Sequence, residues 1–66
     1  MSLYSVIAKD GEGYTVGSEQ RDITAIKREA IRAAKLLLGD EEFVAGGMVK
    51  AEILDSNDEC EWEDFV

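Results

Sequence analysis

Histidine and proline are absent from the 66-residue chain, and cysteine occurs once, at Cys60. Without histidine, the chain lacks the commonest general base and the commonest metal ligand. The single cysteine cannot form an internal disulfide, and its carboxylate neighbours disfavour the reactive thiolate. We therefore expect no catalytic residue, no metal site and no cofactor, and a protein that is not an enzyme.

Long apolar runs are also missing. No stretch approaches the roughly 20 apolar residues that a membrane span needs, and no signal-peptide pattern opens the chain. A lone cysteine without a secretory signal indicates a reducing compartment, so we expect a cytoplasmic protein without membrane contact. The length predicts a single domain over residues 1–66. Because so short a chain builds only a small core, homodimerisation is the expected further source of stability.

Basic residues are few, and the charge is unevenly distributed. Seven Lys and Arg stand against 15 Asp and Glu, which gives a net charge of −8. Six bases and five acids leave residues 1–39 at +1, whereas Lys50 and ten acids leave residues 40–66 at −9. This asymmetry argues against direct nucleic-acid binding through the second half and favours a basic partner there. Solubility is the alternative explanation.

The first eighteen residues predict a β-hairpin. Alternating apolar residues predict a strand over 3–9, with Tyr4, Val6 and Ala8 on one face. Asp10-Gly11-Glu12-Gly13 is typical of a turn, and residues 14–16 resume the alternation as a short second strand.

A helix is predicted over residues 22–38. Asp22 or Thr24 can cap its start, and Gly39 can supply a left-handed cap at its end. Apolar residues recur at spacings of three and four and would lie against the sheet. These residues are Ile23, Ile26, Ala30, Ala33, Ala34 and Leu37, and the outer face would carry Lys27, Arg28, Arg32 and Lys35.

Two further strands follow a charged link at residues 40–42. The third strand lies within 43–54 and is best defined from Met48, with Val49, Ala51 and Ile53 on its buried face. A turn at 56–58 leads into the fourth strand. The predicted class is α+β, with the order ββαββ and one helix packed on one face of an antiparallel sheet of about four strands. The other sheet face would meet water or a second subunit.

Acidic and apolar residues alternate in the C-terminal stretch. A strand there sends Glu59, Glu61 and Glu63 to one face and Cys60 and Trp62 to the other. Successive carboxylates on one face would be roughly 7 Å apart and form an ordered negative array; a merely solvated face is the alternative. The predicted partner-binding residues are Glu52, Asp55, Asp58, Glu59, Glu61, Glu63 and Asp64, supported by Asp40, Glu41 and Glu42.

Two resemblances bear on function. The first half has the pattern Tyr4-x-Val6-Ile7-x-Lys9-Asp10-x-x-Gly13-Tyr14-x-Val16, and its helix contains Glu29-Ala30 and Ala33-Ala34. This order resembles the N-terminal half of HicB-type antitoxins, without the Pro-Gly-Cys segment that usually follows their hairpin. As a very small, very acidic, cysteine-poor chain, the protein also resembles the phage-type DNA-mimic inhibitors of host DNA-binding proteins, such as those against the nucleoid protein HU.

The acidic array and the second resemblance predict an acidic DNA mimic. It would inhibit a basic DNA-binding protein of the host by competing with DNA, without contacting nucleic acid itself. The alternative, which the first resemblance implies, is an antitoxin-like module that blocks a toxin or nuclease through apolar contacts. A third hypothesis is nucleic-acid binding through Lys27, Arg28, Arg32 and Lys35.

Overall fold

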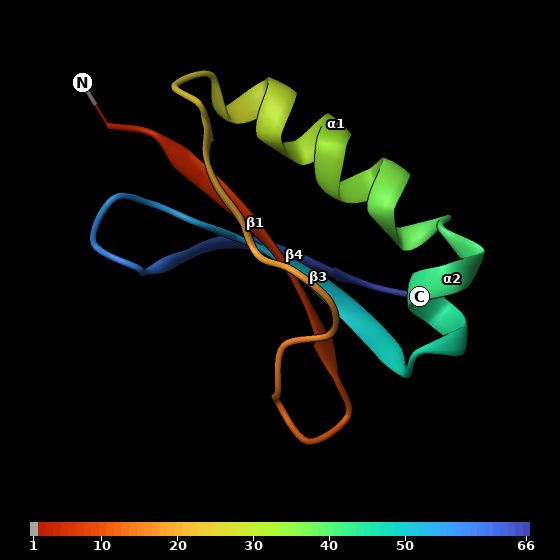
Figure 1. Cartoon of the computed structure of the whole chain (residues 1–66). Coiled ribbons are helices and arrows are strands. Elements are labelled where there is room, and N and C mark those ends of the chain that lie inside the picture. The colour runs from red at the N-terminus through yellow and green to blue at the C-terminus, as the bar shows by residue number, and fades with distance from the viewer. Residues whose placement is uncertain (1) are drawn as a thin grey trace.

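The computed structural model describes residues 2–66, which form four strands and two helices. The elements are β1 (Tyr4–Asp10), β2 (Gln20–Thr24), α1 (Lys27–Leu38), α2 (Glu41–Ala45), β3 (Met48–Leu54) and β4 (Cys60–Phe65). The strands make one antiparallel sheet in the order β2-β1-β3-β4, and α1 lies across one of its faces (Figure 1). The predicted α+β class and four-stranded antiparallel sheet are confirmed, with α2 as an additional helix.

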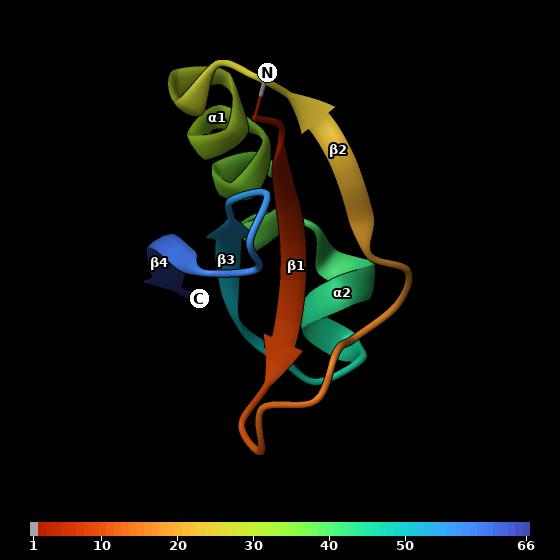
Figure 2. The same ribbon diagram turned by 90° about the vertical axis from the view of Figure 1, so that its left-hand side faces the viewer.

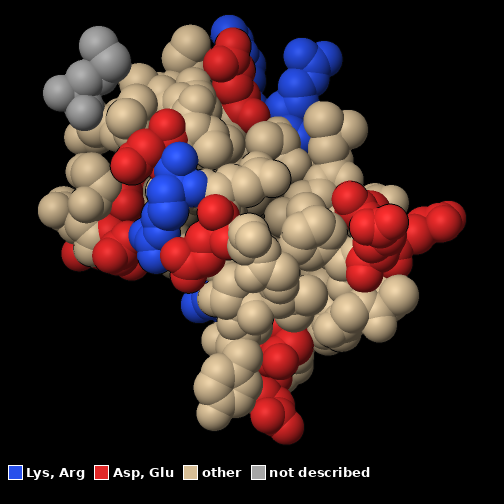
Figure 3. Space-filling view, viewed as in Figure 1, with Lys and Arg blue, Asp and Glu red and all other residues tan. Residues whose placement is uncertain are grey.

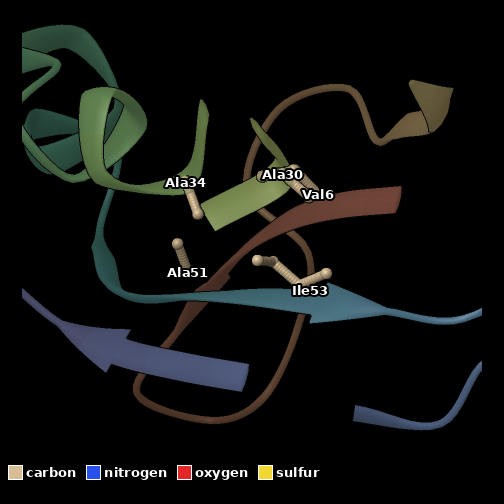
Figure 4. Packing of buried hydrophobic residues seen from close by; sticks show 5 residues of the cluster. All are labelled: Val6, Ala30, Ala34, Ala51 and Ile53. Atoms are coloured by element: carbon tan, nitrogen blue, oxygen red, sulfur yellow. The ribbon is translucent and has the colours of Figure 1, made fainter. Parts of the chain in front are cut away.

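The core lies between α1 and the two central strands. Val6 of β1 is the register partner of Ile53 of β3, and both side chains are fully buried. The buried cluster consists of Val6, Ala30, Ala34, Ala51 and Ile53 (Figure 4). Because alanine is small, Ala30 and Ala34 let the helix backbone approach the sheet closely, which keeps the interior tightly packed. The predicted burial of these two alanines and of Ala51 and Ile53 is confirmed.

The second strand is not where the sequence pattern placed it. Thr15 makes only an isolated bridge with Lys9, and β2 begins at Gln20. The Asp10 carboxylate accepts hydrogen bonds from the backbone of Glu12 and Tyr14, both at 2.9 Å, and so forms the predicted turn. The chain then passes through a longer loop before pairing with β1, and the prediction of a strand at 14–16 is wrong.

Helix α1 begins five residues later than predicted, because residues 20–24 belong to β2. Ile26 stands at the N-cap, where no side chain caps the helix. Thr24 instead accepts a hydrogen bond from the Ile26 backbone at 3.1 Å. Ile23 and Ile26 are therefore 38% and 48% exposed and do not lie on the buried face. Gly39 ends the helix at φ −90°, so the predicted left-handed cap is also wrong.

Residues 41–45 form the short helix α2 and not an irregular link. The Asp40 carboxylate accepts hydrogen bonds from the backbone of Glu42 at 2.9 Å and Phe43 at 3.4 Å. These bonds satisfy two N–H groups that the first helical turn leaves unpaired. Strand β3 consequently starts at Met48, which is buried, whereas Val49 is 39% exposed and was wrongly predicted to be buried.

Gly17 lies where α2 approaches the loop after β1. Its φ is +70°, and a Cβ atom there would stand 2.7 Å from the Phe43 ring. We expect Gly17→Ala to lower the free energy of unfolding by about 1–3 kcal/mol, because both the backbone and the ring must move. Urea denaturation measures this loss.

Gly13 supplies the control. Its φ is +88°, but apart from its chain neighbours no atom of residues 2–66 lies within 4 Å of the Cβ position. Gly13→Ala should therefore lose only the backbone preference, about 1 kcal/mol. Equal losses in the two variants would contradict the role of the Phe43 contact.

Candidate partner-binding surface

Strand β4 is one edge of the sheet and carries much of the negative charge. Within residues 2–66 it pairs with β3 alone. Helix α1 packs mainly over the central strands, and β4 and α2 lie on opposite sides of β3 (Figure 2). Trp62 is half-buried and packs against the core, while its neighbours along β4 are exposed. The outer edge of β4 is thus accessible to a partner.

The regular carboxylate array predicted for this strand is wrong. Glu63 is the register partner of Glu52, but Cys60 is the partner of Leu54, so the pairing shifts at Glu61. Such a bulge sets two residues opposite one and interrupts the alternation of faces. The acids of β4 consequently do not share one face at strand spacing.

The bulge also places Cys60 on the other sheet face from Trp62. The Cys60 sulfur and carboxylate oxygens of Glu52 and Glu63 all lie within 4.8 Å of one another. Lys50 Nζ lies 2.9 Å from the Glu52 carboxylate and 3.2 Å from that of Glu63, so an ammonium group already balances this charge. Burial and then the nearby Glu52 charge raise the pKa of the Cys60 thiol, which therefore stays protonated at neutral pH.

Glu52 lies inside the molecule and is not a surface residue. It is 5% exposed, and its carboxylate pairs with Lys9 at 3.1 Å and Lys50 at 2.9 Å. Burial raises the pKa of Glu52, but hydrogen bonds from the two lysines outweigh it and hold that pKa below its ordinary value. Because its charge is satisfied internally, Glu52 does not belong to the exposed acidic surface on which the prediction placed it, and a partner contact by Glu52 stays a prediction.

The two aspartates of the β3–β4 turn have different roles. Asp55 accepts hydrogen bonds from the backbone of Asn57 at 2.8 Å and Glu59 at 3.0 Å, which fixes the turn. Asp58 has a positive φ of 61° and accepts a hydrogen bond from Arg21 at 2.6 Å. Both aspartates lie in the turn just before β4, but Arg21 partly balances the charge of Asp58.

Arg21 joins two distant parts of the sheet. It extends from β2 to the β3–β4 turn and also donates to Glu19 at 2.7 Å, and the pKa of its guanidinium is raised by hydrogen bonds to Glu19 and Asp58. Because β1 lies between β2 and β3, the side chain must cross β1. On this open face of the sheet, Ile7 and Leu54 are only 3% and 8% exposed. These two apolar side chains are therefore already covered within one copy.

The acids at the start of α2 do not extend the surface on β4. Asp40 is engaged as the cap of α2, and the exposed Glu41 and Glu42 follow it on the side of β3 away from β4 (Figure 2). Figure 3 shows acidic side chains in several separate areas of one molecular face. These three residues therefore do not form one surface with the acids of β4, and their supporting role stays a prediction.

Within residues 2–66, most acids of the second half have no cationic partner. Of the ten in residues 40–66, three form ion pairs within the described chain: Glu52, Asp58 and Glu63. The remaining seven do not. We define the C-terminal acidic surface as the turn and edge-strand carboxylates Asp55, Asp58, Glu59, Glu61, Glu63 and Asp64.

The opposite charge gathers on α1. Lys27, Arg28, Arg32 and Lys35 are all exposed, as predicted, and none of them forms an ion pair with another residue among 2–66. Basic side chains accordingly stand out over α1 in Figure 3. The molecule thus presents a basic helix and an acidic edge strand.

Comparison of the chain with models of protein families, with curated proteins and with solved structures yields no match. Within residues 2–66, neither helix has the length and apolar composition that crossing a bilayer would require.

Proposed function

We propose that the protein is a cytoplasmic, non-enzymatic inhibitor that occupies the DNA-binding surface of a basic host protein and competes with DNA. The C-terminal acidic surface supports this proposal. It concentrates six carboxylates between Asp55 and Asp64, and two of the six are in ion pairs. Lys and Arg side chains that normally contact phosphates would pair with these carboxylates.

Charge density and access support the proposal, and phosphate-like spacing does not. The bulge at Glu61 breaks the regular repeat, yet five of the six side chains are exposed and Asp55 is half-buried. The β3–β4 turn lies at one end of the sheet (Figure 1), so a partner can reach it without moving another element. Attraction between such charges is screened over about 10 Å at 0.1 M salt.

Competition for DNA tests this function. The probe is a labelled DNA duplex bound by a histone-like nucleoid protein, followed by fluorescence anisotropy. The wild-type chain is expected to displace the DNA, and Glu59→Gln/Glu61→Gln/Glu63→Gln is expected to displace it about tenfold less well, because three of the six charges are lost.

Removal of three acids elsewhere supplies the matched control. Glu12→Gln/Glu41→Gln/Glu42→Gln makes the same change in net charge, at exposed positions away from the C-terminal acidic surface. It should compete nearly as well as the wild type. If the two triple variants compete equally, the C-terminal acidic surface is not the binding site.

An antitoxin-like role is the second candidate, and the end of β4 favours it. Phe65 and Val66 are 60% and 62% exposed, and the backbone of Val66 donates to Val49, which is 39% exposed. A toxin or nuclease would be held through these exposed apolar side chains at the end of β4. Binding that survives about 0.5 M salt and is lost in Phe65→Ala would favour this candidate.

A further inference from the structure

Helix α1 and strand β4 line the same side of the molecule. Figure 2 shows both on the side of β1 away from β2. One flank of α1 faces β2, where Ala33, Leu36 and Leu37 border a shallow groove with Gln20. Residues 27, 31, 35 and 38 recur at spacings of four and three, so they belong to the other flank, toward β4.

Apolar side chains lie between the basic helix and the acidic strand. Ile31, Leu38 and Trp62 pack against the core but are only half-buried. This apolar seam, formed by Ile31, Leu38 and Trp62, has Lys27, Arg28 and Lys35 on one side and Glu61 and Asp64 on the other, whereas Glu63 lies on the opposite sheet face with Glu52. Within residues 2–66 of one copy, no ion pair joins α1 to β4. The two charged surfaces are therefore both available to a partner.

We propose that this side of the protein binds a second copy of the chain about a two-fold axis. The α1 cations of each copy contact the β4 acids of the other copy, and the apolar seam is covered at the centre. A two-fold axis repeats each basic–acidic contact and closes the assembly as a dimer. In this interface the cations of α1 and the acids of β4 both meet opposite charges on the same partner, a second copy of the chain.

A second copy fits this side better than nucleic acid does. The chain has a net charge of −8, and the acids of β4 lie beside α1, so they repel a phosphate backbone that approaches the helix. A second copy presents acids to the cations and cations to the acids. The dimer also covers part of the C-terminal acidic surface, so a basic target competes with self-association.

Sedimentation equilibrium of the whole chain tests the dimer. The chain is expected to form dimers at about 50 mM sodium chloride and to become monomeric near 0.5 M, because exposed ion pairs are screened. A wild-type chain that stays monomeric at low salt, or that forms species larger than a dimer, would overturn the proposal. Loss of the dimer would free the C-terminal acidic surface and would not weaken the competition with DNA, so the two results are separable.

Charge reversal identifies the contacts. Arg28→Glu/Lys35→Glu makes α1 acidic and, at two charges for each reversal, changes the net charge from −8 to −12. Glu61→Lys/Asp64→Lys makes β4 basic and changes the net charge from −8 to −4. Each variant alone is expected to dimerise at least about tenfold more weakly. Mixed together they are expected to form a heterodimer, although both carry a net negative charge.

Two further measurements complete the test. Glu41→Lys/Glu42→Lys has the same net charge of −4 but alters α2, so it should still dimerise. Circular dichroism shows whether each variant is folded, and unfolded variants are replaced by the glutamine forms. If the mixture does not associate, or if a DNA duplex binds the wild type and not Arg28→Glu/Lys35→Glu, the proposed interface is wrong.

Discussion

Ile53→Ala is expected to lower the free energy of unfolding by about 2–5 kcal/mol, a large part of the stability of so small a domain. Ile53 is fully buried beneath α1, where it is the register partner of Val6 on β1 and of Trp62 on β4. Alanine would leave a cavity that three strands and a helix cannot close without losing their own contacts. Urea denaturation followed by circular dichroism measures the loss.

Val49→Ala is the matched control on the same strand. Simple alternation places Val49 and Ile53 on one buried face, but Val49 is 39% exposed. Its replacement should cost less than about 1 kcal/mol. If Ile53→Ala does not fold, Ile53→Val should still lose about 0.5–1.5 kcal/mol. A Val49→Ala loss as large as that of Ile53→Ala would contradict the packing described for β3.

The elements with strong periodicity were predictable from the sequence. β1 and β3 each place alternate apolar side chains, including Val6 and Ile53, under α1, as period two requires. The body of α1 follows from the alanines at 30 and 34, which repeat at one helical turn. In these segments the buried residues are the ones that the local sequence pattern marks as apolar, so the pattern alone was sufficient to predict the element and its buried face.

Elements that depend on distant partners were not predictable. Residues 20–24 are mostly polar and exposed, and they become a strand only because β1 offers an open edge to pair with. The alternation of Glu59, Cys60, Glu61 and Trp62 is regular in the sequence, and only the pairing with β3 creates the bulge. No local residue preference marks a bulge at Glu61.

The candidate site was predictable in composition but not in arrangement. The sequence shows that the acids gather after residue 39, since that needs only counting. It does not show that α2 and its N-cap residue Asp40 place three of them away from β4, or that Arg21 reaches Asp58. In the folded chain, the acids of the second half therefore have different roles. Glu52 is buried in an interior network with Lys9 and Lys50, whereas the C-terminal acidic surface is exposed.

Glu52 belongs to that interior network, and its loss is expected to be the second large effect. Glu52→Ala should lower the free energy of unfolding by about 2–4 kcal/mol at neutral pH, because two ammonium groups lose the buried carboxylate between them. Lys9 and Lys50 are 28% and 25% exposed at their side chains, so water relieves part of this cost. Urea denaturation at pH 7 measures the loss.

The same carboxylate makes stability depend on pH. Burial raises the pKa of Glu52, but the hydrogen bonds from Lys50 and Lys9 prevail and hold it below its ordinary value of 4.5. Because the folded pKa is the lower one, Glu52 stabilises the fold above pH 4.5, and the contribution is lost as the pH falls through the folded pKa.

Glu52→Gln should therefore differ from the wild type in unfolding free energy at pH 7 and less at pH 3, because the wild-type carboxylate loses its contribution as the pH falls below 4.5 and through the lowered folded pKa. Glu61→Gln, on the exposed edge strand, removes the same charge and should change the unfolding free energy little at either pH. A Glu52→Gln loss that stayed constant between the two pH values would show that shape and packing, and not the charge held by the two lysines, make Glu52 part of the core.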